Sequence, residues 1–208
     1  MIKAVIFDVD GVLLDSRKAN ILWFKRLLKA TGYEIPSAKK LEKAHTLTLL
    51  DCIRELTGER SERRIKEIFK NADNYAKYPI ELVTVPKGVV RVLKQLRKQY
   101  KLAIVTSRIG STMKEFFDLA KVDNLFEVIV AFGDYKKAKP SPEPLLIAAR
   151  RLGLKPGECI YIGDSDVDVA AANAAGMKII FYSGSNTEGA DIVLHSFGRI
   201  PQAVKRLS

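Results

Sequence analysis

The pattern of apolar and polar positions along this chain changes character twice. Residues 2–7 predict a short buried strand, and residues 17–80 then show helical spacing of apolar residues in several successive segments. From about residue 101 onward, short apolar runs alternate with helical stretches. The pattern predicts an α/β domain that is interrupted, after its first strand, by a helical insert.

The second half of the chain predicts a parallel sheet. Its candidate strands lie at 101–106, 127–132, 159–163 and 177–181, with a weaker one at 191–194. Helices are predicted near 86–99, 111–120, 141–152 and 166–175. Such alternation gives right-handed crossovers, helices on both faces of the sheet, and a ligand site beyond the carboxyl ends of the strands. We expect an α/β fold with a Rossmann-like, three-layer core and a mostly parallel sheet.

The helical insert carries its own start and stop signals. Residues typical of helix N-caps and helix ends occur in it, namely Ser37, Ser61, Gly32 and Gly58. Aromatic residues at helical spacing predict a small core inside the insert, and these are Trp23, Phe24, Phe69 and Tyr75. We expect residues 1–16 and 81–208 to form the core domain, and residues 17–80 to form an α-helical cap.

Composition narrows the class of protein. The 208 residues are 47% hydrophobic, which suffices for a sizeable core. No apolar run is long enough to cross a bilayer, and Asp8 and Asp10 interrupt the segment where a signal peptide would be uncharged. We therefore expect a cytoplasmic protein with no membrane partner. The cysteines, Cys52 and Cys159, are too few for a disulfide framework or a zinc site, and Cys159 is expected to be a buried thiol.

The chain is basic, with a formal net charge of +11. Such an excess is compatible with an anionic substrate or with nucleic acid. No stretch interleaves basic and aromatic residues as a nucleic-acid-binding stripe would, so the sequence favours a small anionic substrate. Phosphatase action on polynucleotide ends stays open as an alternative. We expect a monomer or a dimer, and the sequence does not choose between them.

Polar residues follow the predicted strands where each strand ends. They are Asp8, Asp10, Thr106, Ser107, Asp164 and Asp168, joined by Lys139 in the loop before a helix. Two acids one residue apart after a buried strand are costly to fold unless a cation lies between them. Each residue taken singly has an ordinary explanation, such as a strand-end hydroxyl, a solvated lysine or a helix start. Their joint placement at one sheet edge favours a site.

The chemistry that suits this set is phosphoryl transfer. Carboxylates without histidine or cysteine favour Mg²⁺, which takes oxygen ligands at ~2.0–2.1 Å. A carboxylate also attacks phosphorus to form an aspartyl-phosphate, while hydroxyl, ammonium and backbone N–H donors hold the phosphate oxygens.

Four motifs in this chain resemble those of the haloacid dehalogenase superfamily, in its branch of small phosphatases with a helical cap, which includes phosphoglycolate phosphatase-like and β-phosphoglucomutase-like proteins. They are DVDGVLLDS at 8–16, IVTSR at 104–108, KP at 139–140 and GDSDVDVAAANAAG at 163–176. The motifs occur in the family's order and extend over nearly the whole chain. The resemblance implies the core and cap organisation given above.

The same resemblance implies catalytic roles. Asp8 would be the nucleophile that becomes phosphorylated, and Asp10 the acid that protonates the leaving oxygen and then activates water. Thr106, Ser107 and Lys139 would bind the phosphate.

It also implies a metal site. Mg²⁺ would be bound by Asp8, by the backbone carbonyl of Asp10 and by Asp164, while Asp168 would act behind these ligands or through water.

Contacts with the rest of the substrate are less defined. His45 and Thr46 are candidates in the insert, although a surface or packing role is the alternative for His45. Arg108 is a candidate to contact a second anionic group on the substrate, with a solvated arginine as the alternative.

We expect a Mg²⁺-dependent phosphatase that hydrolyses a small-molecule phosphate monoester through an aspartyl-phosphate on Asp8. Asp10 argues against dehalogenation, because the family's dehalogenase branch replaces this second acid. A sugar phosphomutase and a non-catalytic binding protein of the same fold are the alternatives. The identity of the substrate is not defined by the sequence, because cap loops vary while the four motifs stay alike.

Overall fold

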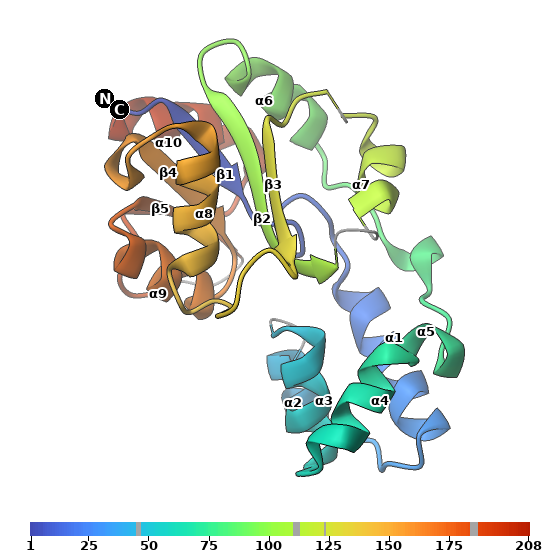
Figure 1. Cartoon of the computed structure of the whole chain (residues 1–208). Helices are drawn as coiled ribbons and strands as arrows, with labels where there is room; N and C mark the ends of the chain where they lie inside the picture. The colour runs from blue at the N-terminus through green and yellow to red at the C-terminus, as the bar shows by residue number, and fades with distance from the viewer. Residues whose placement is uncertain (45–46, 110–112, 123, 184–186) are drawn as a thin grey trace. The chain divides into compact units, whose positions relative to one another are not determined.

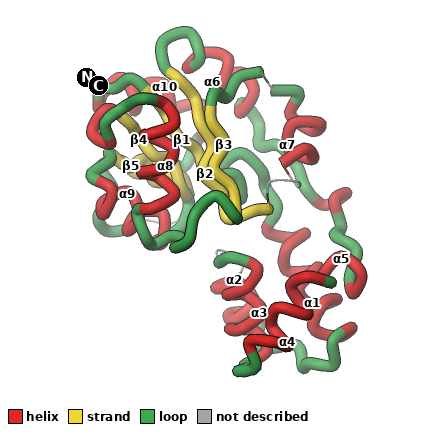
Figure 2. The backbone as a smooth tube through the Cα atoms, viewed as in Figure 1, coloured by secondary structure: helices red, strands yellow, loops and turns green. Residues whose placement is uncertain are grey.

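The structure is a computed structural model of the 208-residue chain (Figure 1). It describes residues 1–44, 47–109, 113–122, 124–183 and 187–208. By its internal contacts the chain divides into two compact units, Met1–Leu14 with Val85–Ser208, and Asp15–Thr84. The first unit is built on a sheet and the second is helical (Figure 2).

The first unit contains, within the described residues, a six-stranded sheet whose neighbouring strands are all parallel. In order across the sheet, the strands are β3 (Val128–Phe132), β2 (Lys101–Ile109), β1 (Ala4–Phe7), β4 (Cys159–Gly163), β5 (Lys178–Tyr182) and β6 (Ile192–Leu194). The chain runs outward from β1 to β3 and then resumes on the other side of β1 with β4, so the strand order reverses between β1 and β4. The predicted α/β fold with a parallel sheet is confirmed.

Helices cover both faces of this sheet (Figure 1). The helices of the first unit are α6 (Val89–Leu96), α7 (Met113–Ala120), α8 (Glu143–Leu152), α9 (Asp166–Ala175) and α10 (Ile200–Leu207), with short 3-10 turns at Pro156–Glu158 and Phe197–Arg199. α8 and α9 pack on the strand residues that share a face with Ile6, Val105 and Tyr161. α6 and α10 contact each other and the strands β2 and β5. Because successive strand residues point to opposite faces, strands covered on both sides are apolar throughout.

The second unit is a small helical bundle with its own core. Its elements are α1 (Arg17–Ala30), α2 (Ala38–Ala44), α3 (Leu49–Thr57), α4 (Glu62–Lys70) and α5 (Ala72–Tyr75), with a 3-10 turn at Ile80–Leu82. Trp23 and Phe24 are buried in this core, and Phe69 and Tyr75 pack against it partly buried, as the aromatic spacing predicted. The indole N–H of Trp23 donates to the carbonyl of Ala76 at 2.7 Å.

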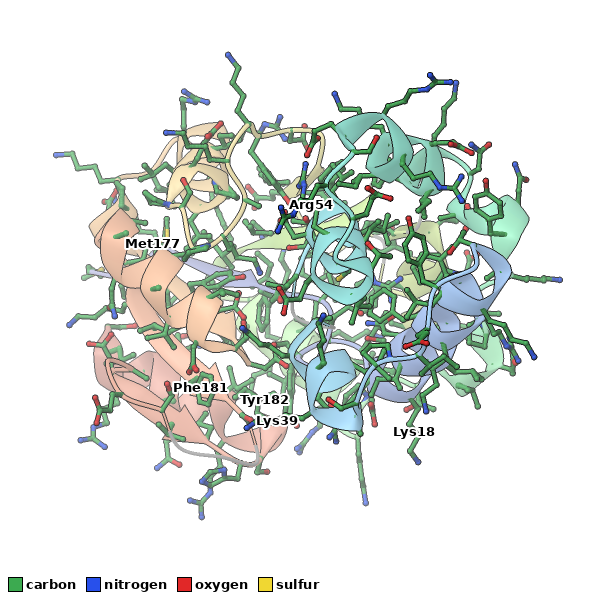
Figure 3. The ribbon with its side chains drawn as sticks, turned by 90° about the horizontal axis from the view of Figure 1, so that it is seen from below. Lys18, Lys39, Arg54, Met177, Phe181 and Tyr182 are labelled. Carbon is green, nitrogen blue, oxygen red and sulfur yellow. The ribbon has the colours of Figure 1, made fainter. Side chains whose placement is uncertain are left out.

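The ends of the helices in this unit are fixed by local hydrogen bonds. The hydroxyl of Ser61 accepts the N–H of Arg64 at the start of α4, and Gly58 ends α3 in the left-handed conformation, both as predicted. Exposed lysines such as Lys18 and Lys39 lie on the outside of the unit, whereas Arg54 pairs with acids of α3 and α4 (Figure 3).

The two ends of the second unit lie side by side. The N–H of Asp15 donates to the carbonyl of Thr84 at 2.8 Å, and the N–H of Thr84 donates back to Asp15 at 3.2 Å. This antiparallel pair brings together the points where the chain enters and leaves the unit.

One strand boundary differs from the prediction in a way that affects the site. β2 continues to Ile109, whereas the apolar run predicted its end at 106. Its pairing with β3 shifts register between Val105 and Ile109, so Thr106, Ser107 and Arg108 lie in an irregular segment of the strand. Such a bulge depends on pairing with the neighbouring strand, which the hydrophobic pattern does not encode.

Within the described residues, no helix is long and apolar enough to span a membrane.

Candidate functional site

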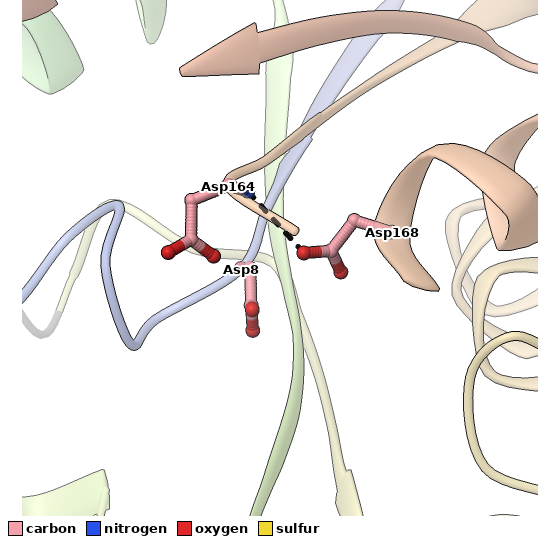
Figure 4. A group of neighbouring side chains, drawn as sticks. All are labelled: Asp8, Asp164 and Asp168. Atoms are coloured by element: carbon pink, nitrogen blue, oxygen red, sulfur yellow. Dashed lines mark hydrogen bonds between the residues drawn. The ribbon is translucent and has the colours of Figure 1, made fainter. Parts of the chain in front are cut away.

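Three carboxylates meet where β1 and β4 end (Figure 4). Asp8 directly follows β1, Asp164 directly follows β4, and Asp168 lies in the first turn of α9. One carboxylate oxygen of each lies within 4.8 Å of the others. Because the strand order reverses between β1 and β4, the group occupies the position where open parallel sheets bind their ligands.

Two glycines make room for these carboxylates. Gly11 has a φ of 77°, and a Cβ at this position would lie 1.8 Å from Oδ2 of Asp164. A Cβ at Gly163 would lie 2.4 Å from the Cβ of Asp168. The chain reaches the Gly11 conformation through a tight turn in which its N–H donates to the carbonyl of Leu14 at 2.8 Å. A residue without a side chain is therefore required at both positions.

Lys139 bridges two of the acids. Its Nζ lies 2.6 Å from Oδ1 of Asp168 and 3.2 Å from Oδ2 of Asp8. It also donates to the hydroxyl of Tyr161 at 3.0 Å, and that hydroxyl donates to Oδ1 of Asp168 at 3.0 Å. Tyr161, in the middle of β4, is completely buried. We did not predict Tyr161 as a site residue, although a tyrosine inside a buried strand needs a partner for its hydroxyl and so gives a signal.

Asp168 is occupied by protein donors at both of its oxygens. Besides Lys139 and Tyr161 on Oδ1, its Oδ2 accepts the N–H groups of Asp164 at 3.2 Å and of Ser165 at 3.1 Å, and the hydroxyl of Ser165 at 2.5 Å. These bonds form a capping box at the start of α9. Asp168 thus fixes Lys139 and the end of β4.

The electrostatics of the three acids differ. Burial raises the pKa of Asp8 to about 7, Lys139 opposes this, and Asp168 and Asp10 add to it. Burial, with Asp168 and Asp8 nearby, also raises the pKa of Asp164 well above its ordinary value. Burial acts in the same direction on Asp168 and is the largest single influence, but the charge of Lys139 and the hydrogen bonds from Lys139, Ser165 and Tyr161 together lower the pKa of Asp168.

The charges of this group fit a divalent cation. When ionised, Asp8, Asp164 and Asp168 carry three negative charges against the one positive charge of Lys139. The pKa values of Asp8 and Asp164 are raised because burial, and then the neighbouring negative charges, make their ionisation unfavourable. A hard, oxygen-seeking ion such as Mg²⁺ would offset two charges, and the all-carboxylate set is the kind that binds it.

Asp10 lies beside this group and is bound by an arginine. Nε of Arg108 donates to Oδ2 of Asp10 at 2.8 Å, and Nη2 donates to Oδ1 at 2.9 Å. The Asp10 side chain is 21% exposed and that of Arg108 is 11% exposed. Arg108 was expected to face the substrate or solvent, and in the structure it holds the carboxylate of Asp10. The pairing joins residues 98 positions apart, which no local pattern reveals.

The predicted phosphate-binding residues Thr106 and Ser107 lie on β2. Because Phe7 pairs with Ile104, Thr106 stands just beyond the end of β1 and beside the acids that follow it. Thr106 is buried, and its Oγ1 accepts the N–H of Arg108 at 3.1 Å. The hydroxyl of Tyr135, another residue that the sequence did not single out, donates to the carbonyl of Thr106 at 3.3 Å.

Two further candidates were placed in the helical insert. His45 and Thr46 lie outside the described residues, so the structure gives no contacts for them.

Known proteins match this chain over most of its length. A family model described as haloacid dehalogenase-like hydrolase matches residues 5–182. The chain belongs to the haloacid dehalogenase-like hydrolase family. It is therefore a hydrolase, and the family predicted from the four motifs is confirmed.

Its relatives include enzymes of phosphate chemistry. Pyrophosphatase PpaX of Halalkalibacterium halodurans is 34% identical over 178 residues, which cover 85% of this chain and 81% of that protein. Phosphoglycolate phosphatase of Aquifex aeolicus is 27% identical over 177 residues, covering 85% and 82%. The crystal structure of β-phosphoglucomutase from Clostridium difficile shares the fold with a TM-score of 0.86 at 22% identity, over 100% of this chain and 97% of that one.

Proposed function

We propose that this hydrolase is a Mg²⁺-dependent phosphatase that acts on a small-molecule phosphate monoester through a phosphorylated Asp8. The observation that carries the proposal is the position of Asp8, which lies 3.2 Å from the Lys139 ammonium and beside Asp164 where the strand order reverses. Relatives named as a pyrophosphatase and a phosphoglycolate phosphatase support the reaction class.

In the first step, a carboxylate oxygen of Asp8 attacks phosphorus and forms an oxygen–phosphorus bond. The bond from phosphorus to the leaving oxygen breaks, the electron pair stays on that oxygen, and Asp10 gives it a proton. Lys139 and the hydroxyl of Thr106 would donate to the phosphoryl oxygens while charge shifts onto them.

In the second step, water attacks the same phosphorus. Asp10, now a carboxylate, takes the proton of that water, and the bond between phosphorus and the Asp8 oxygen breaks. Inorganic phosphate leaves, Asp8 returns as a carboxylate and Asp10 is again protonated, so the cycle closes without another reactant.

Mg²⁺ would be held by Asp8, Asp164 and the backbone carbonyl of Asp10. When bound, the ion supplies positive charge that offsets the substrate phosphate and the two acids. Asp168 would keep Lys139 in place rather than bind the ion, because both of its oxygens already accept hydrogen bonds from the protein.

The helical unit Asp15–Thr84 is proposed to act as a cap for this site. Aspartyl-phosphate chemistry must exclude water in the first step and admit one molecule in the second, which a hinged unit achieves. The isolated β-bridge between Asp15 and Thr84 would let its two connections bend together.

Phosphate release from a panel of esters tests the proposal. Purified protein should release phosphate from p-nitrophenyl phosphate or phosphoglycolate with Mg²⁺ and not with EDTA, and Asp8→Asn should remove at least ~99.9% of that activity, as expected for loss of a nucleophile. Asp118→Asn, at an exposed acid on α7, is the matched control and should keep it. Full activity in the Asp8 variant would contradict the mechanism. Transfer of phosphate between positions of a sugar phosphate, with little release, would identify a phosphomutase instead.

A further inference from the structure

Arg108 forms an ion pair with the carboxylate of Asp10, which we assign as the acid and base. Both oxygens of Asp10 accept from one guanidinium, at 2.8 Å and 2.9 Å, in the side-on geometry that arginine makes with carboxylates. In the proposed first step, an oxygen of Asp10 must face the leaving oxygen of the substrate. That oxygen is engaged while the pair persists, so the pair has to open in each reaction cycle.

Separation of Arg108 from Asp10 costs free energy. The Arg108 side chain is 11% exposed, and a guanidinium in such a place is costly to leave without an anion. An anion that takes the place of Asp10 offsets the cost of breaking this two-bond ion pair. A carboxylate or a phosphate group can present two oxygens to Nε and Nη2 of Arg108, as Asp10 does.

We propose that Arg108 is a specificity residue that exchanges Asp10 for a second anionic group on the leaving part of the substrate. The inference rests on the function proposed above. Substrates with a carboxylate or second phosphate near the reacting phosphoryl group would release Asp10 on binding, whereas esters with a neutral leaving part would leave it paired. Binding of the correct substrate is thereby coupled to freeing the acid.

The local geometry of β2 supports this exchange. Thr106, which would hold the reacting phosphate, and Arg108 stand two residues apart in one irregular segment, and the N–H of Arg108 donates to Oγ1 of Thr106 at 3.1 Å. One strand end thus carries a donor for each of two anionic groups. Their separation suits a small molecule in which those groups are close.

The test compares two esters that differ in one group. Phosphoglycolate carries a carboxylate, and 2-hydroxyethyl phosphate carries a neutral hydroxymethyl group in its place. Wild-type protein with Mg²⁺ should prefer phosphoglycolate in kcat/KM by about ten- to hundredfold, the range of a charge-assisted hydrogen-bonded contact. Equal kcat/KM values for the two esters would overturn the proposal.

Variants then assign the preference to Arg108. Arg108→Ala should raise KM for phosphoglycolate and abolish the preference, so kcat/KM should fall at least tenfold more for phosphoglycolate than for 2-hydroxyethyl phosphate. Arg108→Lys should restore part of the preference. Arg97→Ala, which removes an arginine paired with Glu127, is the matched control and should keep all of it. Equal losses on both esters in Arg108→Ala would show a merely structural role and contradict the exchange.

A binding measurement separates this inference from the proposed function. In the Asp8→Asn background, calorimetry should show tighter binding of phosphoglycolate than of 2-hydroxyethyl phosphate, and added Arg108→Ala should remove the difference. If wild-type protein hydrolyses neither ester while this difference persists, the proposed function fails and Arg108 still recognises an anion. Equal binding of both esters in the Asp8→Asn protein would refute the role of Arg108.

Discussion

At the scale of single residues, the hydroxyl of Tyr161 is the least expected part of the site. It accepts from Lys139 and donates to Asp168, both at 3.0 Å. Tyr161→Phe keeps the ring and removes these bonds, so we expect a loss of about 1–3 kcal/mol in the free energy of unfolding and a lower kcat. Urea unfolding and steady-state kinetics measure the two effects. Tyr100→Phe, at a half-buried ring whose hydroxyl lies 3.3 Å from that of Ser208, is the control. It should change the free energy of unfolding by no more than about 0.5 kcal/mol and leave kcat unchanged.

Gly11 is a second residue whose role is testable against a matched position. Gly11 and Gly153 have φ of 77° and 72°, but an added Cβ meets Asp164 at Gly11 and nothing within 4 Å at Gly153. Gly153→Ala should therefore cost only the backbone strain, about 1–2 kcal/mol, and keep activity. Gly11→Ala should also displace Asp164 and abolish Mg²⁺-dependent phosphate release. Active Gly11→Ala protein would show that Asp164 has room to move without loss of function.

The sequence could identify residues whose role follows from position along a strand. Asp8 and Asp164 were predictable because parallel strands end at one edge of the sheet, so a polar residue after an apolar run points to that edge. The bond of Arg108 to Asp10 was not predictable in the same way, because it joins distant segments and depends on side-chain geometry. Tyr161 was hidden for another reason, since an aromatic residue in a buried strand is usually core.

At the scale of elements, the apolar runs located the strands well because both faces of the sheet are covered. β4 lies at Cys159–Gly163, as predicted. The end of β2 was wrong by three residues, because its bulge is set by pairing with β3. The helix predicted at 86–99 spans only Val89–Leu96, since the chain enters it through Gly88 in the left-handed conformation. Pairing and caps therefore limit what periodicity reveals.

The start of α9 offers a prediction at this scale. The Ser165 hydroxyl is part of the capping box with Asp168, and the Ser61 hydroxyl caps α4 in the helical unit. Ser165→Ala and Ser61→Ala should each cost about 1 kcal/mol in the free energy of unfolding, as lost N-caps do. Ser165→Ala alone should also lower kcat, because Asp168 orients Lys139. Thermal unfolding and phosphate release compare the pair, and equal kcat values would show that the capping box does not support catalysis.

At the scale of the whole molecule, the sequence predicts the chemistry of the sheet unit better than the substrate preference of the helical unit. The sheet unit contains the acids of the site together with Lys139 and Arg108, so the reaction class could be predicted from the motifs of this unit. The helical unit has a complete apolar core and a charged outside, and these features are common to many small helical bundles. Its packing was predictable, whereas the substrate it would admit was not.

The charge excess of the site leads to a prediction about stability of the whole protein. When Asp8, Asp164 and Asp168 are ionised, the group with Lys139 carries two net negative charges that destabilise the metal-free fold. A cation that binds only the folded state therefore raises Tm, and a tighter-binding cation raises it more. Mg²⁺ at 5 mM should therefore raise Tm, and Na⁺ at equal ionic strength should not. Asp164→Asn should abolish the Mg²⁺ effect.

This stabilisation should depend on pH in a definite direction. The pKa of Asp8 is raised to about 7 in the metal-free fold, so the folded state holds that proton more tightly than the unfolded state, and the stability gained from it is lost as pH rises through 7. Mg²⁺ binds the carboxylate and competes with the proton, so its effect on Tm should be larger at pH 8 than at pH 5. Differential scanning calorimetry with Mg²⁺ or EDTA at both pH values measures this. A Tm shift that is larger at pH 5 would contradict an ion bound through Asp8 and would place the cation elsewhere on the molecule.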